Sequence, residues 1–200
     1  MRALATPAGD VVLQRLAQAH ERQRLIAVRE SLADLLSAFH WCSAPYTEGD
    51  NRDYVASCRK SWDLMHEFVF GVFDRTGRFV GEAAIDDLDL AAGSANLSYW
   101  IAPSARRRGH GAKAAAVAAR FAFRDLGLRE LRLLVAPGNV ASKRIASKLS
   151  ATPAPATSIA APETAPSRED LRFVLDASHD TEVLRRDPAS FPYQGISQGG

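Results

Sequence analysis

The sequence contains few cysteines, no long apolar run and almost no net charge. Cys42 and Cys58 are its only cysteines, and they lack the spacing of a metal site. No run of 18 apolar residues is present to cross a membrane, and no secretory signal peptide opens the chain. A formal net charge of +2 gives the chain as a whole no reason to bind nucleic acid or an anionic membrane. We therefore expect no metal ion, no membrane and no nucleic acid as a partner, and a location in the reducing cytoplasm.

The length and composition favour a single folded domain. The chain has 200 residues, of which 46% are hydrophobic, and this is enough to bury a substantial core in one unit. We expect that core to span about residues 11–176. Residues 151–167 are rich in Ala, Pro, Ser and Thr and predict a loop, and residues 187–200 predict a flexible tail.

Apolar periodicity in the first third of the chain predicts one strand followed by helices. Residues 11–16 form a short apolar run that is typical of a strand. Over residues 19–39 apolar side chains recur every three or four positions, and Ser31 is a candidate N-cap of a second helix within that span. Residues 47–62 predict another helix, because Thr47 is a suitable N-cap and acidic residues follow it in the first turns.

The remainder of the chain alternates between strand and helix patterns. A period of two marks strands at residues 68–73 and 78–85, and the turn at 74–77 joins them as a hairpin. The expected elements then continue as a strand at 97–101, a helix at 112–126, a strand at 131–135, a helix at 139–149 and a last strand at 171–175.

A basic, glycine-containing loop lies between the strand that ends at Ile101 and the Ala-rich helix. It comprises three arginines, Arg106 to Arg108, followed by Gly109, His110 and Gly111. Glycines let a ligand approach the backbone, and the amides and dipole at the start of a helix favour an anion. The loop therefore predicts a site for a phosphate group.

Three other readings of this loop are weaker. Gly109, Gly111 and Ala114 match a dinucleotide pattern, but Val135 to Pro137 occupy the place where that fold needs an acidic residue. A P-loop would require Ser or Thr after Lys113, where the chain has Ala114. A nucleic-acid site would rest on the three arginines alone, without an accompanying basic and aromatic sheet.

The chain resembles the GNAT superfamily of acyl-CoA-dependent N-acyltransferases. The family signature R/Q-x-x-G-x-G/A is matched by Arg106, Gly109 and Gly111, and a second block about thirty residues later is matched by Asn139 and Ser142. The Tyr-Trp-hydrophobic-x-Pro sequence before the loop is similar to the branch that acetylates the N-termini of ribosomal proteins, the RimJ/RimL-like branch. The resemblance covers roughly residues 11–149. It implies an α+β fold of the GNAT type, with a central mixed and strongly twisted sheet flanked by helices.

The resemblance also implies which residues contact acetyl-CoA. Family members bind the pyrophosphate at the start of the helix and pair the pantetheine arm with the splayed edge of the preceding strand. A backbone amide near Ile101 would stabilise the thioester oxygen, and Ser142 is the candidate for protonating the departing sulfur. Ala146 stands where many members have an acid tyrosine, which agrees with the serine variant. The implied cofactor contacts are Tyr99, Trp100, Ile101, Arg106, Arg107, Arg108, Gly109, His110, Gly111, Ala112, Asn139 and Ser142.

The sequence leaves the general base open. Asn96 stands where the family often has an acidic residue, and Ser98 replaces a common glycine. The carboxylates that end the preceding strand are Glu82, Asp86, Asp87 and Asp89, and Glu82 completes our catalytic set with Ser142 and Ile101. The ordinary interpretation of each of these four is a solvated surface carboxylate.

These features predict direct transfer of an acetyl group from acetyl-CoA to a primary amine, with a protein N-terminal α-amine as the first choice. An α-amine has a pKa of about 7.7 to 8.0 and a lysine about 10.4, so an α-amine needs less help from a base. Two alternatives stay open: a non-catalytic CoA-binding or regulatory module, suggested by Asn96, Ser150 and Ala151, and an acetyltransferase for a small-molecule amine such as an antibiotic or polyamine. The sequence does not decide the oligomeric state, and a homodimer is compatible with it.

Overall fold

The computed structural model describes residues 3–6, 9–39, 41–154 and 171–177. Within them, eight strands form one sheet in the order β1-β2-β3-β4-β5-β6-β8-β7. The strands are β1 (Leu4–Ala5), β2 (Val11–Arg15), β3 (Phe68–Asp74), β4 (Phe79–Asp89), β5 (Ser94–Ile101), β6 (Glu130–Val135), β7 (Thr152–Ala154) and β8 (Leu171–Asp176).

Only the central pair β5 and β6 runs parallel among the described strands, and all other neighbours are antiparallel. The parallel connection passes through helix α4 (His110–Arg124), since parallel neighbours need a crossover. The sheet is therefore mixed and is accompanied by helices, as the sequence predicted.

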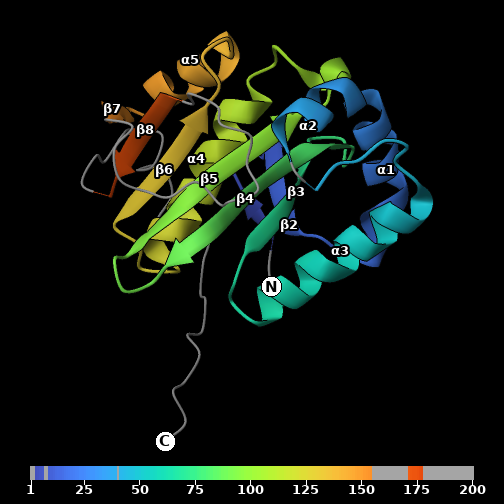
Figure 1. Ribbon diagram of the computed structural model, residues 1–200, viewed down its shortest axis with the longest axis horizontal. Coiled ribbons are helices and arrows are strands. Elements are labelled where there is room, and N and C mark those ends of the chain that lie inside the picture. Colours follow the sequence, from blue (N-terminus) through green and yellow to red (C-terminus); the bar gives the residue numbers. More distant parts are fainter. Residues whose placement is uncertain (1–2, 7–8, 40, 155–170, 178–200) are drawn as a thin grey trace, which may run out of the picture.

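The helices cover both faces of the sheet. Helices α1 (Glu21–Glu30), α2 (Leu32–Ala38) and α3 (Glu48–Asp63) gather beside β2 to β4 on one face (Figure 1). On the other face α4 packs across β2, β4 and β5, and α5 (Val140–Lys148) lies beside α4 and β6. Two short 3-10 turns, Gln18–His20 and Pro103–Ala105, precede α1 and the basic loop.

The alternation of side chains along β5 divides the core into two parts. Leu97, Tyr99 and Ile101 pack in the cluster that contains α4, whereas Trp100 packs in the cluster that contains α1 and α3. Successive residues of a strand point to opposite faces, so neighbouring residues of β5 pack in different parts of the core.

Most predicted elements are present, and three local expectations are wrong. Leu4–Ala5 forms a strand ahead of the core expected at about residues 11–176, and Thr152–Ala154 pairs with β8 inside the predicted loop at 151–167. Ser31 does separate two helices, but its hydroxyl donates back to Ala27 O at 2.7 Å and does not cap α2. The rest of that loop and the predicted tail at 187–200 lie outside the described residues.

Candidate active site

The edge of β5 becomes free where β6 turns away from it. The ladder between the two strands pairs Ser94 with Glu130, Ala95 with Leu131 and Asn96 with Arg132, and it extends no further. Beyond Asn96, β5 continues to Ile101 while paired only with β4 on its other side. The two central strands therefore splay apart from Leu97 onward.

The register shows which backbone groups face this opening. The Ala102 amide donates to Val80 O at 2.9 Å, so the even-numbered residues of this part of β5 exchange hydrogen bonds with β4. The amides and carbonyls of Tyr99 and Ile101 consequently point to the open edge. An extended ligand laid along this edge would find the amide and carbonyl of Tyr99 and the amide of Ile101, while the Ile101 carbonyl already accepts from Arg106 Nε at 3.0 Å.

The N-terminus of α4 is the second component of the site. Its N-cap is Gly109, with φ of +82°, and no side chain caps the helix. The first intrahelical bond of this turn runs from the Lys113 amide to Gly109 O at 3.1 Å, so the preceding amides have no partner within the helix. The turn also lacks an acidic residue, whereas α3 begins with a Thr47–Asp50 capping box. The start of α4 thus keeps its capacity to bind an anion.

The two glycines of the loop have different physical roles. Gly109 adopts a left-handed conformation that other residues rarely accept. Gly111 lies where α4, α5 and β5 converge: a Cβ there would lie 3.0 Å from Ile145 Cδ1 and 3.5 Å from Ile101 Cγ1. Both glycines keep side chains away from the start of the helix, as expected of a loop that a ligand approaches.

The three arginines are not equivalent. The Arg106 guanidinium pairs with Asp34 on α2, and its Nε donates to Ile101 O at 3.0 Å, so this side chain ties the end of β5 to α2. Arg107 and Arg108 are exposed, and Arg107 has a positive φ of 61°. The charge expected from Arg106 is therefore already neutralised by Asp34, and Arg107 and Arg108 remain the candidates for a phosphate. His110 Nδ1 lies 3.1 Å from Ala105 O and joins the helix start to the preceding turn.

The residues of the second sequence block lie at the start of α5. Asn139 is the N-cap, and its side-chain oxygen accepts a hydrogen bond from the Ser142 amide at 3.0 Å. The Asn139 Nδ2 group, with its two hydrogens, is thus the side-chain donor that a ligand could use. Ser142 is half-buried, one turn before Ile145 on the same helix.

Tyr99 places a polar atom in the apolar surroundings of this face. Its hydroxyl oxygen is buried and has no hydrogen-bond partner among the described residues. Burial raises the pKa of Tyr99, and an interaction with the Ser142 hydroxyl lowers it in part. The two hydroxyl groups therefore lie close together, although no hydrogen bond of good geometry joins them.

On the opposite face, Glu82 belongs to a buried polar cluster. Its carboxylate accepts from Arg24 Nε at 2.6 Å and from Trp100 Nε1 at 2.9 Å, and the Tyr54 hydroxyl lies 3.3 Å away. Glu82 is only 3% exposed, so its interpretation as a surface carboxylate is wrong. Because its oxygens already accept from an arginine and an indole, we infer that Glu82 is poorly placed to take a proton from a substrate.

The other candidate bases differ in their contacts. Asp87 pairs with Arg132 at 3.1 Å, and Asp89 accepts from the Ala92 amide at 2.8 Å. Asp86 accepts from the Ser98 hydroxyl at 2.7 Å, on the face of β5 that carries Trp100. Burial and the charges of Asp86 and Glu82 raise the pKa of Glu67 to about 7.

Glu67 is the residue that sequence reasoning missed. It follows α3 and precedes β3, and nothing in its local sequence distinguishes it from a surface glutamate. Only the pairing of β3 with β4, with Phe68 opposite Ile85, brings it beside Asp86. Tyr99 was predicted as a backbone contact for the cofactor, but the sequence did not predict that its hydroxyl is buried without a partner among the described residues.

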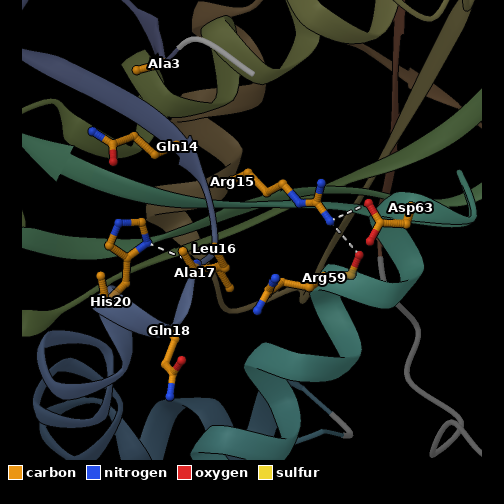
Figure 2. A pocket seen from close by; sticks show the side chains of 10 residues that line it. Ala3, Gln14, Arg15, Leu16, Ala17, Gln18, His20, Arg59 and Asp63 are labelled. Atoms are coloured by element: carbon orange, nitrogen blue, oxygen red, sulfur yellow. Dashed lines mark hydrogen bonds and ion pairs between the residues drawn. The ribbon is translucent and has the colours of Figure 1, made fainter. Parts of the chain in front are cut away.

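A groove of about 910 Å³ lies elsewhere, along β2 and α3 (Figure 2). Its lining includes the ion pair of Arg15 with Asp63 at 2.7 Å and the Arg59 side chain. None of the predicted site residues lines it, and β3 and β4 lie between β2 and β5 in the sheet. The groove is therefore separate from the site at the open edge.

No helix among the described residues is long and apolar enough to cross a membrane. In the same part of the chain, no group of three or more His, Cys, Asp or Glu side chains could hold a metal ion.

Comparison with solved structures places the fold among acetyltransferases. The ribosomal α-N-protein acetyltransferase RimL in complex with coenzyme A superposes with a TM-score of 0.78 at 13% identity, over 90% of this chain and 100% of that one. RimJ of Mycobacterium smegmatis gives a TM-score of 0.71 at 21% identity, over 92% and 90% of the two chains. The microcin C7 self-immunity acetyltransferase MccE, in complex with acetyl-CoA and AMP, gives 0.73 at 12% identity, over 84% and 92%.

Sequence comparison identifies the family directly. No curated protein shows a significant sequence match. The family model for the acetyltransferase (GNAT) domain, however, matches residues 4–152, which include the open edge of β5, the start of α4 and both sequence blocks. The chain therefore belongs to the GNAT acetyltransferase family.

Proposed function

We propose that this protein transfers an acetyl group from acetyl-CoA to the α-amine of a protein N-terminus. The observation that carries the proposal is the free edge of β5 beside the uncapped start of α4. One element offers backbone hydrogen bonds to an extended amide-containing arm, and the other offers amides and positive charge to a pyrophosphate. Coenzyme A contains both groups, joined end to end.

Different residues of the site would bind different parts of acetyl-CoA. The amides of His110, Gly111 and Ala112, with Arg107 and Arg108, would hold the pyrophosphate. The open edge at Tyr99 and Ile101 would pair with the pantetheine arm, and the amide group of Asn139 would meet it from α5. The Ile101 amide, which points to the opening, would donate to the thioester oxygen as charge develops there.

The reaction needs one bond made, one bond broken and one proton moved. The amine nitrogen bonds to the acetyl carbon, the carbon–sulfur bond breaks, and its electron pair goes to sulfur. The proton lost by the amine is matched by one that sulfur gains, for which Ser142 is the nearest candidate donor on α5; solvent then restores the serine proton. Holding amine and thioester together supplies much of the rate enhancement.

We assign the proton-accepting role on the acceptor side to the pair of Glu67 and Asp86. Ser98 links Asp86 to β5 through a 2.7 Å hydrogen bond, so the pair adjoins the strand that would carry the thioester. A carboxylate whose pKa is about 7 can accept a proton at neutral pH better than an ordinary one. An α-amine, with a pKa of about 7.7 to 8.0, suits such a base.

The direct test measures CoA release from acetyl-CoA in the presence of peptides. Peptides that begin with free Ser, Ala or Met should be acetylated, and mass spectrometry should locate the acetyl group on the α-nitrogen. The matched control peptide has a blocked N-terminus and an internal lysine, and it should remain unmodified. Acetylation of the lysine peptide alone would contradict the choice of acceptor.

A small-molecule amine is the second candidate acceptor. The Glu67–Asp86 pair favours it, because two neighbouring carboxylates attract a polyamine or an aminoglycoside. Turnover of spermidine or kanamycin without turnover of any peptide would select this alternative. Binding of acetyl-CoA without turnover of any amine would instead select a non-catalytic module.

A further inference from the structure

The Tyr99 hydroxyl is a buried polar group that neither the fold nor the proposed reaction uses. Its oxygen is excluded from solvent and lacks a partner among the described residues. A buried hydroxyl without a hydrogen bond is destabilising, so such a group calls for an explanation. The rest of the Tyr99 side chain packs beside α4 in the larger core, which holds the hydroxyl in place.

The position of this hydroxyl connects it to the leaving-group side of the site. Tyr99 and Ile101 point to the same face of β5, and Ile101 lies next to Gly111 and Ile145. Ser142 lies one turn before Ile145, and its hydroxyl is close enough to Tyr99 to affect the Tyr99 pKa. The phenol therefore reaches the serine from the strand along which the thioester would lie.

We propose that Tyr99 positions Ser142: the phenol donates a hydrogen bond to Ser142 Oγ and thereby directs the serine hydrogen at the sulfur of CoA. This inference rests on the proposed function. A tyrosine is suited to this role because burial raises its pKa and keeps it a donor throughout the neutral range. When its hydrogen points to the sulfur, Ser142 Oγ is left to accept this bond.

The consequence is a thiolate that is stabilised at the site. The CoA thiol is a simple alkyl thiol, and its pKa lies above the value of about 8.5 for a cysteine side chain, which is lowered by the adjoining peptide groups. A serine hydrogen bond to sulfur favours the charged form, so the pKa of the bound thiol falls. Binding of CoA then strengthens as the pH rises, whereas desulfo-CoA, which lacks the sulfur, has no such dependence.

The experiment is calorimetric titration of CoA and of desulfo-CoA between about pH 6.5 and pH 9.5, with the unmodified protein, Tyr99→Phe, Ser142→Ala and the double variant. In the unmodified protein we expect the affinity for CoA, divided by the affinity for desulfo-CoA, to rise about tenfold across this pH range. In Tyr99→Phe the same rise should be smaller by a factor of about three or more. Ser142→Ala should remove the rise, and adding Tyr99→Phe to it should change nothing further. Tyr46→Phe, which removes a buried phenol that accepts from Arg24 at 2.7 Å, is the control and should keep the rise.

Several outcomes would overturn the inference. The proposal fails if Tyr99→Phe leaves the pH dependence intact, or if it weakens desulfo-CoA as much as CoA, since the phenol then only shapes the pocket. It also fails if Tyr99→Phe keeps its effect in the Ser142→Ala background. Absence of CoA binding by the unmodified protein at any pH would overturn the proposed function itself, which is a distinct result.

Discussion

Arg24 on α1 and Glu82 on β4 form a buried ion pair, with Arg24 Nε 2.6 Å from Glu82 Oε1. Tyr46 and Asn51 accept from the same guanidinium at 2.7 and 2.8 Å, and the Tyr54 ring lies 3.8 Å from its centre. These contacts join α1, α3 and the segment before α3 to the centre of the sheet. The pair thus orders the helices on the face opposite α4 and α5.

Arg24→Met is expected to destabilise the protein by about 3–5 kcal/mol, because it leaves Glu82 charged and buried without its partner. Urea unfolding followed by circular dichroism measures this. Asp63→Asn provides the comparison, since its ion pair with Arg15 is exposed and should contribute about 1 kcal/mol or less. Equal losses in the free energy of unfolding would show that the buried pair contributes no more to stability than the exposed pair.

Gly81→Ala should destabilise β4 and β5 strongly. A Cβ at Gly81 would lie 2.1 Å from Trp100 O, so the strand pair must separate to accept it. We expect a loss of more than about 2 kcal/mol, measured by thermal unfolding. Gly138→Ala is the matched control, because no atom lies within 4 Å of a Cβ there. Similar melting temperatures for the two variants would contradict the predicted clash.

Gly109→Val and Gly111→Leu should weaken acetyl-CoA binding by at least about tenfold, which corresponds to about 1.4 kcal/mol. The first variant strains the left-handed start of α4, and the second places a side chain between Ile101 and Ile145. Calorimetry measures the affinity. Gly127→Val is the control, because its φ of +69° imposes the same strain beyond the opposite end of α4, where no atom lies within 4 Å of a Cβ. If Gly127→Val weakens binding equally, the effect comes from lost stability and not from the site.

Glu67 should make the stability of the protein depend on pH. Its pKa is raised from 4.5 to about 7 in the folded state, so the folded state binds more protons than the unfolded state between these values. Stability should therefore fall as the pH rises from about 4.5 to about 7 and level off above that. Glu67→Gln should flatten this fall, as measured by urea unfolding across the range. An unchanged slope would show that Glu67 is not the titrating group.

Asp86→Asn should lower kcat/KM about tenfold or more for the accepted amine and alter its pH profile, if the pair with Glu67 takes the proton. Asp89→Asn is the control, because Asp89 only accepts from a backbone amide in the turn after β4. An unaltered pH profile in Asp86→Asn would remove this carboxylate from the reaction.

Local signals in the sequence determined much of the architecture. Thr47 followed by Asp50 specified the start of α3, and the alternation in residues 68–73 and 78–85 specified a hairpin, because capping and side-chain periodicity act over a few residues. The basic loop, its two glycines and the Asn139–Ser142 block indicated the family by their spacing along the chain, and the match of the family model confirmed that family.

Tertiary structure decided which of these residues are available for chemistry. Glu82 became a buried partner of Arg24, 58 residues away, and Arg106 became a partner of Asp34, because helix packing brought these charges together. Strand pairing placed Glu67 beside Asp86, and the divergence of β5 and β6 exposed the edge at Tyr99 and Ile101. Contacts of this kind depend on register and packing between distant segments, which no local pattern in the sequence encodes.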